Sequence, residues 1–362
     1  MSIRVPRAVF AAGVALLAGG LTLPTTASAQ SRGSGDPRPQ GVGGDAPLTA
    51  WGHPDLQGNW SNATITPIQR PAGQEPVLSV DEVREIEGTR VARIEEEAAP
   101  SDPDRDAPPV GGDGSTGAAG GVGGYNYFWI DAGDRVAVYN GEYRSSLITR
   151  PAHGRMPDLL PEARDRIAAA RAPMRRFGQY DNPENRPMAE RCIMSFGSNL
   201  GPPMAPNYFY NNNYTIVQTP EAVMIMTEMV HDVRVIRLGE RTNPLPPHVR
   251  PYGGDSWGRW EGDALVVETT NIHPTQGFQG IPATPDLKVI ERFTRADANT
   301  INYEFTVIDP TTFTEPWGGE IPYYKLDGLV YEYACHEGNY ALANVLSGAR
   351  AEERAAQQNQ QD

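Results

Sequence analysis

Residues 287–308, LKVIERFTRADANTINYEFTVI, decide the fold class of this chain, because they hold two strand-like runs joined by a turn signal. From Ile301 to Val307, apolar residues alternate with polar ones, which is the period of a strand with one buried face. The polar stretch 296–299 between the two runs is typical of a tight hairpin turn. These residues therefore predict a pair of antiparallel strands.

Strand-like segments continue on both sides of this hairpin, from Tyr214 onward. They are rich in β-branched and aromatic residues, and short turn signals separate them. Because no long helical segment connects them, we predict a mainly β fold, an antiparallel up-and-down, lipocalin-like β-barrel with a few N-terminal helices. The other predicted strands are 214–219, 222–230, 233–239, 264–271, 320–326 and 329–335.

Two helices are predicted before these strands. Ser79 and Glu82 have the spacing of a capping box and precede apolar residues at helical spacing up to residue 97. The segment 161–172, PEARDRIAAARA, is typical of a second, shorter helix.

The N-terminal residues predict an exported protein. Arg4 and Arg7 precede an apolar run, 8–21, that is too short to span a bilayer, and Ala27-Ser28-Ala29 follows it. We therefore expect a Sec signal peptide, residues 1–29, cleaved after Ala29, and a periplasmic or secreted location. No transmembrane segment is expected in the mature chain.

The mature chain is predicted to contain a disordered leader, 30–50, whose glycine, proline and serine residues bury little. A single β-rich domain is expected over 51–350, with a flexible glycine-rich loop at 100–124 and a polar tail at 351–362. A division into two domains near residue 125 is the alternative.

Composition excludes several function classes. The chain has 362 residues, with 31 Lys+Arg against 45 Asp+Glu and a net charge of −14. This acidic balance argues against a nucleic-acid partner, which requires a basic face.

Cys192 and Cys335 are the only cysteines and are predicted to form a disulfide in an oxidising compartment. A nucleophilic Cys335 beside His336 is the alternative.

Glu291 is an acidic residue on a predicted apolar strand face, which it shares with Val289 and Phe293. A buried carboxylate must be paired or hydrogen-bonded, and Arg234 is one of the nearby candidate partners, with Arg237 and Arg292. One interpretation is a polar cavity in which Glu291 and Arg234 bind a ligand. The other is an ion pair that braces the sheet.

Two histidine–acid pairs are the candidate catalytic residues. His231-Asp232 interrupts an apolar strand pair, and His336-Glu337 follows the last predicted strand. If the two pairs meet at one barrel mouth, they can act as general acid and base. A divalent metal held by His231 and His336 is a further alternative, although no local ligand motif marks either pair and the cofactor stays unknown. Polar hairpin ends would explain the same pattern.

Residues 253–263, GGDSWGRWEGD, combine turn glycines with charged and aromatic residues. We predict that they form the rim of a ligand site, where an arginine stacks on an indole. A rigid hairpin without a ligand is the alternative. The predicted ligand-binding residues here are Asp255, Trp257, Arg259 and Trp260.

Four motifs together resemble a family of uncharacterised exported proteins of Gram-negative bacteria. The likeness covers most of the chain, from about Trp51 to Arg350. The resemblance implies export and a lipocalin-like β-barrel, and it transfers no catalytic residue. The motifs are HPDLQGNWS at 53–61, GDSWGRWEGDALVVETTN at 254–271, ERFTRADANTINYEFTVIDP at 291–310 and YEYACHEGNY at 331–340.

These observations lead to two classes of function. The first is an exported barrel that binds a small organic molecule, a sugar or an aromatic compound, and acts on it as an acid/base lyase or hydrolase. The second is a non-catalytic ligand carrier or an envelope interaction protein. The aromatic residues of the barrel, Trp317 among them, fit both classes.

Overall fold

The computed structural model describes residues 46–98, 104, 106, 130–176, 178–197 and 199–360. The predicted signal peptide and the leader up to residue 45 lie outside the described residues. So do the glycine-rich loop, apart from Asp104 and Asp106, and the last two residues of the polar tail.

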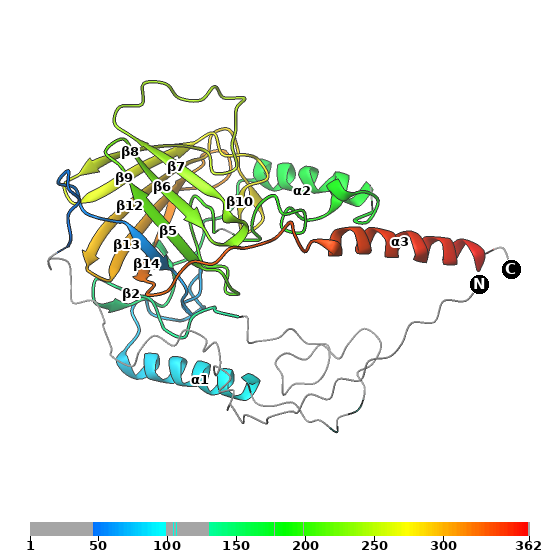
Figure 1. Ribbon diagram of the computed structural model, residues 1–362, viewed down its shortest axis with the longest axis horizontal. Coiled ribbons are helices and arrows are strands. Elements are labelled where there is room, and N and C mark those ends of the chain that lie inside the picture. The colour runs from blue at the N-terminus through cyan, green and yellow to red at the C-terminus, as the bar shows by residue number, and fades with distance from the viewer. Residues whose placement is uncertain are drawn as a thin grey trace, which may run out of the picture. The chain divides into compact units, whose positions relative to one another are not determined.

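Nine strands pair around a closed ring, so the fold is mainly β and its centre is a β-barrel (Figure 1). The ring order is β1-β5-β6-β7-β8-β9-β12-β13-β14, and the pairing of β1 with β14 closes it. The barrel strands are β1 (Gly58–Ser61), β5 (Asn213–Gln218), β6 (Ala222–Thr227), β7 (Val233–Leu238), β8 (Asp255–Glu261), β9 (Ala264–Thr270), β12 (Lys288–Asp297), β13 (Thr300–Ile308) and β14 (Trp317–Lys325).

One pair in the ring, β7 with β8, is parallel, and the other pairs are antiparallel. A ring of purely antiparallel pairs needs an even number of strands, because the directions must alternate all the way round. Nine strands cannot satisfy this condition. The prediction of an antiparallel up-and-down barrel is therefore corrected to a mixed barrel, in which the long connection 239–254 returns the chain from β7 to the start of β8.

The barrel has two different ends. At one end, named here the hairpin end, tight turns join the strands at residues 219–221, 262–263 and 298–299. At the other end, named the plug end, the chain makes longer connections, and β5, β7, β8, β12 and β14 begin. The directions of the paired strands place all five of these starts at the same end.

Shorter strands lie outside the ring. Strand β4 (Ile148–Arg150) pairs with β14, while β2 (Val138–Tyr139) pairs with β3 (Glu142–Tyr143). Strand β10 (Gly277–Phe278) pairs with β11 (Ile281–Pro282) within the connection between β9 and β12.

Three α-helices occur among the described residues, α1 (Val80–Ala98), α2 (Pro161–Arg176) and α3 (Tyr340–Gln358). The predicted capping box begins α1: Glu82 N donates to Ser79 Oγ, and Ser79 N donates to Glu82 Oε2. Helices α1 and α2 confirm the two predicted helices, and α2 extends beyond its predicted end. The short 3₁₀ helices η2 (Pro183–Asn185) and η3 (Met229–His231) complete the helical segments.

The segment 329–335, predicted as the last strand, is not a strand in the structure. It follows β14, which already pairs with β13 on one side and with β1 and β4 on the other. Because a closed ring has no free edge, this segment has no ring strand to pair with, although its composition is typical of a strand. The segment runs outside the barrel and leads to α3 (Figure 1).

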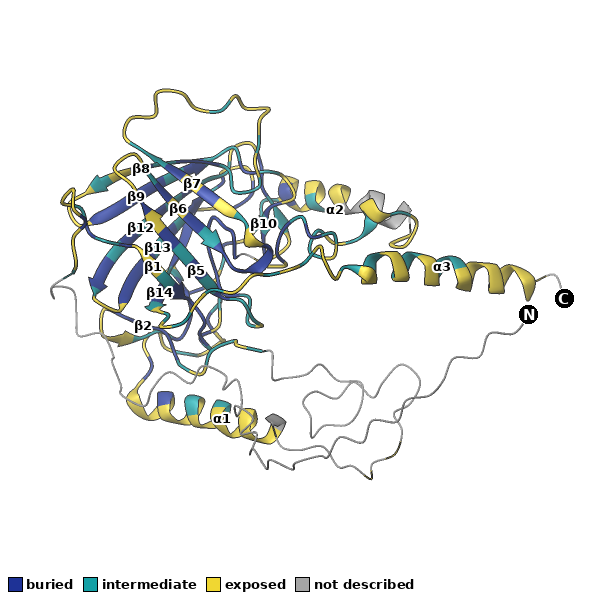
Figure 2. Ribbon diagram, viewed as in Figure 1, coloured by how far each residue is buried: buried dark blue, intermediate teal, exposed yellow. Residues whose placement is uncertain are grey.

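The barrel strands contain many buried residues (Figure 2), and their inward side chains form the main apolar core. The alternation predicted for β13 is confirmed, since Ile301, Tyr303, Phe305 and Val307 are all buried in this core. At the hairpin end, Trp60 closes the core and packs under the guanidinium of Arg295, 4.5 Å from its ring centroid.

Glu291 is buried inside the barrel, as its strand face predicted, and Arg234 is its partner. The side chains are 0% and 1% exposed. Arg234 Nη2 donates to Glu291 Oε1 over 2.9 Å, and Tyr303 OH donates to the same oxygen over 2.9 Å. Arg234 Nη1 also lies 2.9 Å from Glu291 Oε2, without the alignment of a hydrogen bond. The barrel therefore encloses a charge pair at its centre.

Cys192 and Cys335 form the predicted disulfide, with Cα atoms 5.8 Å apart. The bond ties the segment that follows β14 to the connection between α2 and β5. No helix in the described part of the chain has the length and apolar character needed to cross a membrane.

We expect Glu291→Leu to lower the free energy of unfolding by about 3–5 kcal/mol, because it leaves the Arg234 guanidinium buried without a counter-charge. The double variant Arg234→Met/Glu291→Leu should recover most of this loss, since both charges are then absent. Urea unfolding of the three proteins measures the difference.

The control is Glu261→Gln, which breaks the exposed ion pairs with Arg259 and Arg292 and should cost about 0–1 kcal/mol. A loss no larger than that control in Glu291→Leu would contradict a central role for the buried pair.

Candidate functional site

A loop of residues 199–205, named here the plug, enters the barrel at the plug end. Met204 and Ala205 belong to the barrel core. Met204 N donates to Tyr303 OH over 3.0 Å, and Tyr323 OH donates to Met204 O over 3.3 Å. The backbone of the plug therefore satisfies polar side chains of the barrel wall and fills the space between them.

The interior above the plug is a packed polar layer. Asn62 Nδ2 contacts both Tyr214 OH and Tyr323 OH, at 3.3 and 3.2 Å. Burial, and then the nearby Glu291 charge, raises the pKa of Tyr303 well above its usual value, so this phenol stays a proton donor. Arg234 and Glu291, predicted as ligand-binding residues, are paired with each other inside this layer.

A small pocket lies between the plug and the barrel wall. Its free volume is about 30 Å³, which is room for about two water molecules. Its walls are mainly apolar and aromatic, and Gln276 and Asp309 supply its polar groups. The lining residues are Pro202, Pro203, Ile272, Gln276, Gly277, Phe278, Ile281, Pro282, Leu287, Val289, Val307, Asp309, Phe313 and Trp317.

Trp317 is the largest aromatic residue of this pocket. Its ring lies 5.1 Å from that of Phe278 and 5.7 Å from that of Phe313, between centroids. The residue is 1% exposed, yet its indole Nε1 has no hydrogen-bond partner. A buried N–H without a partner costs free energy. Trp317 lines the pocket and thus carries a buried indole N–H without a partner.

The polar groups beside Trp317 already have partners. Asp309 Oδ2 accepts from the hydroxyls of Thr284 and Thr312, at 2.9 and 2.8 Å. Gln276 Nε2 donates to Gly201 O in the plug over 3.1 Å. These contacts connect the pocket wall to the plug and to the connection that follows β13.

His231 and Asp232 lie at the plug end, in the turn between β6 and β7. Val230 and His231 have positive φ angles of 63° and 46°. A positive φ is especially unusual for Val230, which is β-branched, and it indicates backbone strain in this turn. Burial raises the pKa of Asp232 to about 6, although the neighbouring His231 opposes the shift. Asp232 Oδ2 is buried and has no hydrogen-bond partner. This carboxyl group therefore titrates near neutral pH.

The second histidine–acid pair follows a segment that contacts His231. His231 Nδ1 lies 3.3 Å from Tyr333 O, two residues before Cys335. His336 and Glu337 are themselves exposed, in the turn that precedes α3. The structure therefore brings the two segments together through a backbone contact. Among the described residues, no group of three or more His, Cys, Asp or Glu is placed to hold a metal ion.

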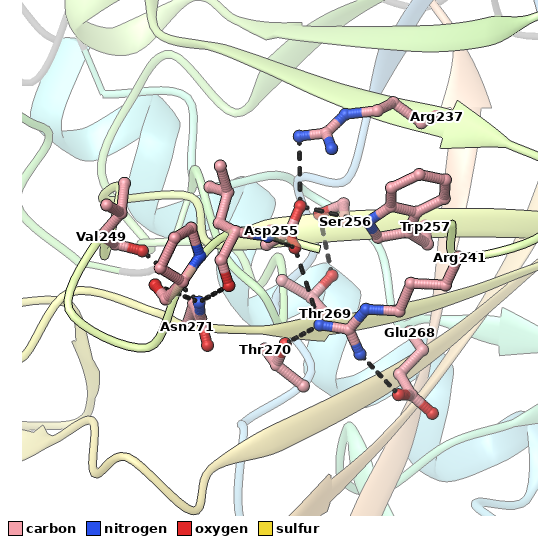
Figure 3. Close-up of polar contacts among 12 residues, drawn as sticks. Arg237, Arg241, Val249, Asp255, Ser256, Trp257, Glu268, Thr269, Thr270 and Asn271 are labelled. Atoms are coloured by element: carbon pink, nitrogen blue, oxygen red, sulfur yellow. Dashed lines mark hydrogen bonds and ion pairs between the residues drawn. The ribbon is translucent and has the colours of Figure 1, made fainter. Parts of the chain in front are cut away.

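Asp255 is buried beneath the connection 239–254 on the outer side of the barrel (Figure 3). Arg237 Nη2 lies 3.1 Å from Oδ1 and Arg241 Nη2 lies 3.6 Å from Oδ2. Trp257 Nε1 donates to Oδ1, and Leu245 N donates to Oδ2. Because both oxygens have partners, this predicted ligand-binding residue fastens the long connection to the barrel wall.

The remaining predicted ligand-binding residues are spread over the barrel. The guanidinium that stacks on Trp257 is that of Arg237, at 4.9 Å, rather than that of Arg259. Arg259 is exposed and paired with Glu261. Trp260 packs at the hairpin end, where it stacks on His53 with ring centroids 4.8 Å apart. These side chains do not form one site.

Comparisons with protein-family models, with curated proteins and with solved structures found no match.

The plug and the pocket were not predicted as a site. The one signal for the plug is the sequence 201–206, GPPMAP, in which prolines exclude regular structure while Met and Ala remain apolar. Trp317 was noted only as a barrel aromatic. Its pocket partners Phe278 and Gln276 lie in the connection between β9 and β12, so their approach depends on the closure of the ring.

Asp232→Asn tests the environment of this carboxyl group. A pKa raised from 3.8 to about 6 favours folding when the group is protonated. This stabilisation is fully present below about pH 4 and is lost as the pH rises through 6. We therefore expect the variant, relative to the wild type, to gain stability from pH 4 to pH 7, by about 1 kcal/mol once partial solvent exposure is allowed for.

Urea unfolding across this pH range measures the effect. Asp263→Asn, which neutralises an exposed turn residue, is the control and should change stability by no more than about 0.5 kcal/mol. A constant difference between Asp232→Asn and the wild type from pH 4 to pH 7 would contradict the assignment.

Proposed function

We propose that this chain is an exported protein that binds a small aromatic molecule at the plug end of its barrel. The observation that carries the proposal is the buried Trp317 N–H, which lacks a partner and belongs to a pocket with aromatic walls. Concave, mainly apolar sites with few polar groups are the usual form of small-molecule sites.

The chemistry of the walls favours an aromatic compound over a sugar. Phe278, Phe313 and Trp317 offer ring faces and edges, while a sugar would require several free hydrogen-bonding groups. The hydroxyl and carboxylate groups around Asp309 are already paired with one another. A ring that carries one acceptor, such as a carbonyl oxygen, matches the one free donor.

The free volume is smaller than a ring requires, since a cavity that holds benzene measures about 150 Å³. Binding therefore requires a displacement of the pocket wall. Only Val289, Val307 and Trp317 of the lining belong to ring strands, whereas the plug and the connections between β9 and β12 and between β13 and β14 supply the rest of the wall. We infer that the plug moves when the ligand enters, and that the barrel strands keep their places.

Export is supported by the disulfide, because such bonds persist in oxidising compartments. The N-terminal residues and the likeness to exported Gram-negative proteins support the same location. Within this proposal the protein is a periplasmic or secreted binding protein.

Acetophenone, an aromatic ring with one carbonyl acceptor, is the probe for this site. We expect Trp317→Phe to weaken its binding about tenfold, because one hydrogen bond worth about 1.4 kcal/mol is lost while the ring remains. Isothermal titration calorimetry measures the affinity.

Trp260→Phe is the matched control, since its indole N–H is also buried without a partner but lies at the hairpin end. Its affinity should equal that of the wild type. Equal affinity in Trp317→Phe, or preference for methyl glucoside over acetophenone, would overturn the proposal.

A second candidate function, acid–base catalysis, is favoured by the turn that carries His231 and Asp232. Strained backbone concentrates at functional sites, and a carboxyl group with a pKa of about 6 can exchange protons at neutral pH. In this candidate function, Asp232 is the general base, His231 assists it, and the exposed His336 and Glu337 complete the site.

Hydrolysis of p-nitrophenyl acetate tests the catalytic candidate. The rate should rise as the pH passes through about 6, because Asp232 then loses its proton. It should fall to the uncatalysed rate in Asp232→Asn and decrease in His231→Ala and in His336→Ala. Turnover that persists in all three variants removes the catalytic assignment and leaves the binding function standing.

A further inference from the structure

The outer wall of the barrel has two halves of different chemistry. On β8, β9 and β12 the outward side chains form ion pairs, such as Arg292 with Glu261 and Lys288 with Glu268. On β5, β6 and β7 the outward side chains are mainly apolar. The wall at β8, β9 and β12 is therefore charged, whereas the wall at β5, β6 and β7 exposes apolar side chains to solvent.

Three apolar residues form a row across the second half. Val217 pairs with Met224, and Met224 pairs with Val235, so the three side chains lie side by side on neighbouring strands. Their exposed fractions are 39, 40 and 46%, and Val233 on the same face is 52% exposed. A continuous exposed patch of this kind marks an interaction surface.

The segment that follows β14 extends this apolar surface. Asn59 Nδ2 donates to Gly328 O at one end of the segment, and His231 Nδ1 contacts Tyr333 O at the other. Between these two anchors, Leu329 and Tyr331 are 73 and 67% exposed. The apolar face consists of Val217, Met224, Val233, Val235, Leu329 and Tyr331.

We propose that this apolar face is the interface of a homodimer, so that its occupant is a second copy of the chain. A second copy supplies the same uncharged surface, whereas the rest of a chain with net charge −14 repels its copy. The nine-stranded ring itself has no free edge for strand addition, so the ring can associate only through the outer face of its wall.

A two-fold axis that lies in the interface and crosses the strands fits the residues at the borders. It places Met224 on Met224 of the second copy and Val235 on its own equivalent, as an isologous interface requires. Because this axis crosses the strands, the border on one side of it in one copy faces the border on the other side in the second copy. Arg237, which is 41% exposed and also pairs with Asp255, lies at one border, and the exposed Glu332 lies at the other. Opposite charges therefore meet at the edges of the apolar contact.

The curvature of a barrel wall limits the contact. Aligned sheets pack about 10 Å apart, and a stable interface buries about 800 Å² on each partner. The central row alone is too small for this area, and Leu329 and Tyr331 are the residues that enlarge it. We therefore expect a dimer in equilibrium with the monomer.

Sedimentation velocity of the purified chain over about 1–100 µM tests the dimer. We expect the sedimenting species to change from monomer to dimer as the concentration rises. Raising the NaCl concentration from 0.05 to about 0.5 M should strengthen association, because salt screens the repulsion between acidic copies. Met224→Glu should weaken association by at least about tenfold, since it places two carboxylates together on the axis.

Ile86→Glu is the matched control. Ile86 is 39% exposed on α1, away from the apolar face, and its variant should associate as the wild type does. A wild-type chain that stays monomeric at 100 µM, or a Met224→Glu variant that dimerises unchanged, overturns the proposal. Binding to lipid vesicles without self-association overturns it too.

A cross-linking experiment decides the matter if Met224→Glu fails to fold. A cysteine introduced by Met224→Cys lies opposite itself across the axis, and the two native cysteines are already paired with each other. Mild oxidation should therefore yield a covalent dimer in Met224→Cys and none in Ile86→Cys. The absence of a covalent dimer in Met224→Cys contradicts the interface. This test is independent of the binding function proposed for Trp317.

Discussion

The closure of nine strands into one ring is the constraint on which the rest of this structure depends. An odd ring requires one parallel pair, and the β7–β8 pair requires the long connection 239–254. Asp255 holds this connection on the wall by accepting from Leu245 N and pairing with two arginines. Closure also leaves the strand-like segment 329–335 without a partner strand, and the disulfide ties it to the connection between α2 and β5.

The interior follows from the same closure. Inward side chains from five strands and the plug meet in a layer that contains Arg234 and Glu291, and their charges compensate each other. The plug supplies backbone partners for Tyr303 and Tyr323, so the barrel is filled rather than hollow. A small pocket lies at the plug end, and the binding proposed there requires displacement of a loop.

Much of the fold was predictable, because strand alternation and helix caps are local patterns. The site was less predictable. Glu291 and its partner Arg234 were identified from one strand face and from charge, whereas Asp255 and Arg259 were grouped only because they are neighbours in sequence. In a strand, neighbours in sequence point to opposite faces, and residues that meet in a site come from distant strands. Trp317 becomes part of a pocket only because Phe278 and the plug lie beside it in the folded chain.

The sequence by itself determined seven of the nine barrel strands, several of their buried faces, the first two helices and the pairing of the only two cysteines. Each of these depends on a short-range period or on elimination. Tertiary structure alone decided the number of strands in the ring, the parallel pair and the occupant of the interior. These features depend on which distant segments meet, and that choice minimises unpaired backbone and empty volume over the whole barrel at once. A short stretch of sequence cannot reveal this choice, because it depends on the backbone pairing and packing of the whole barrel.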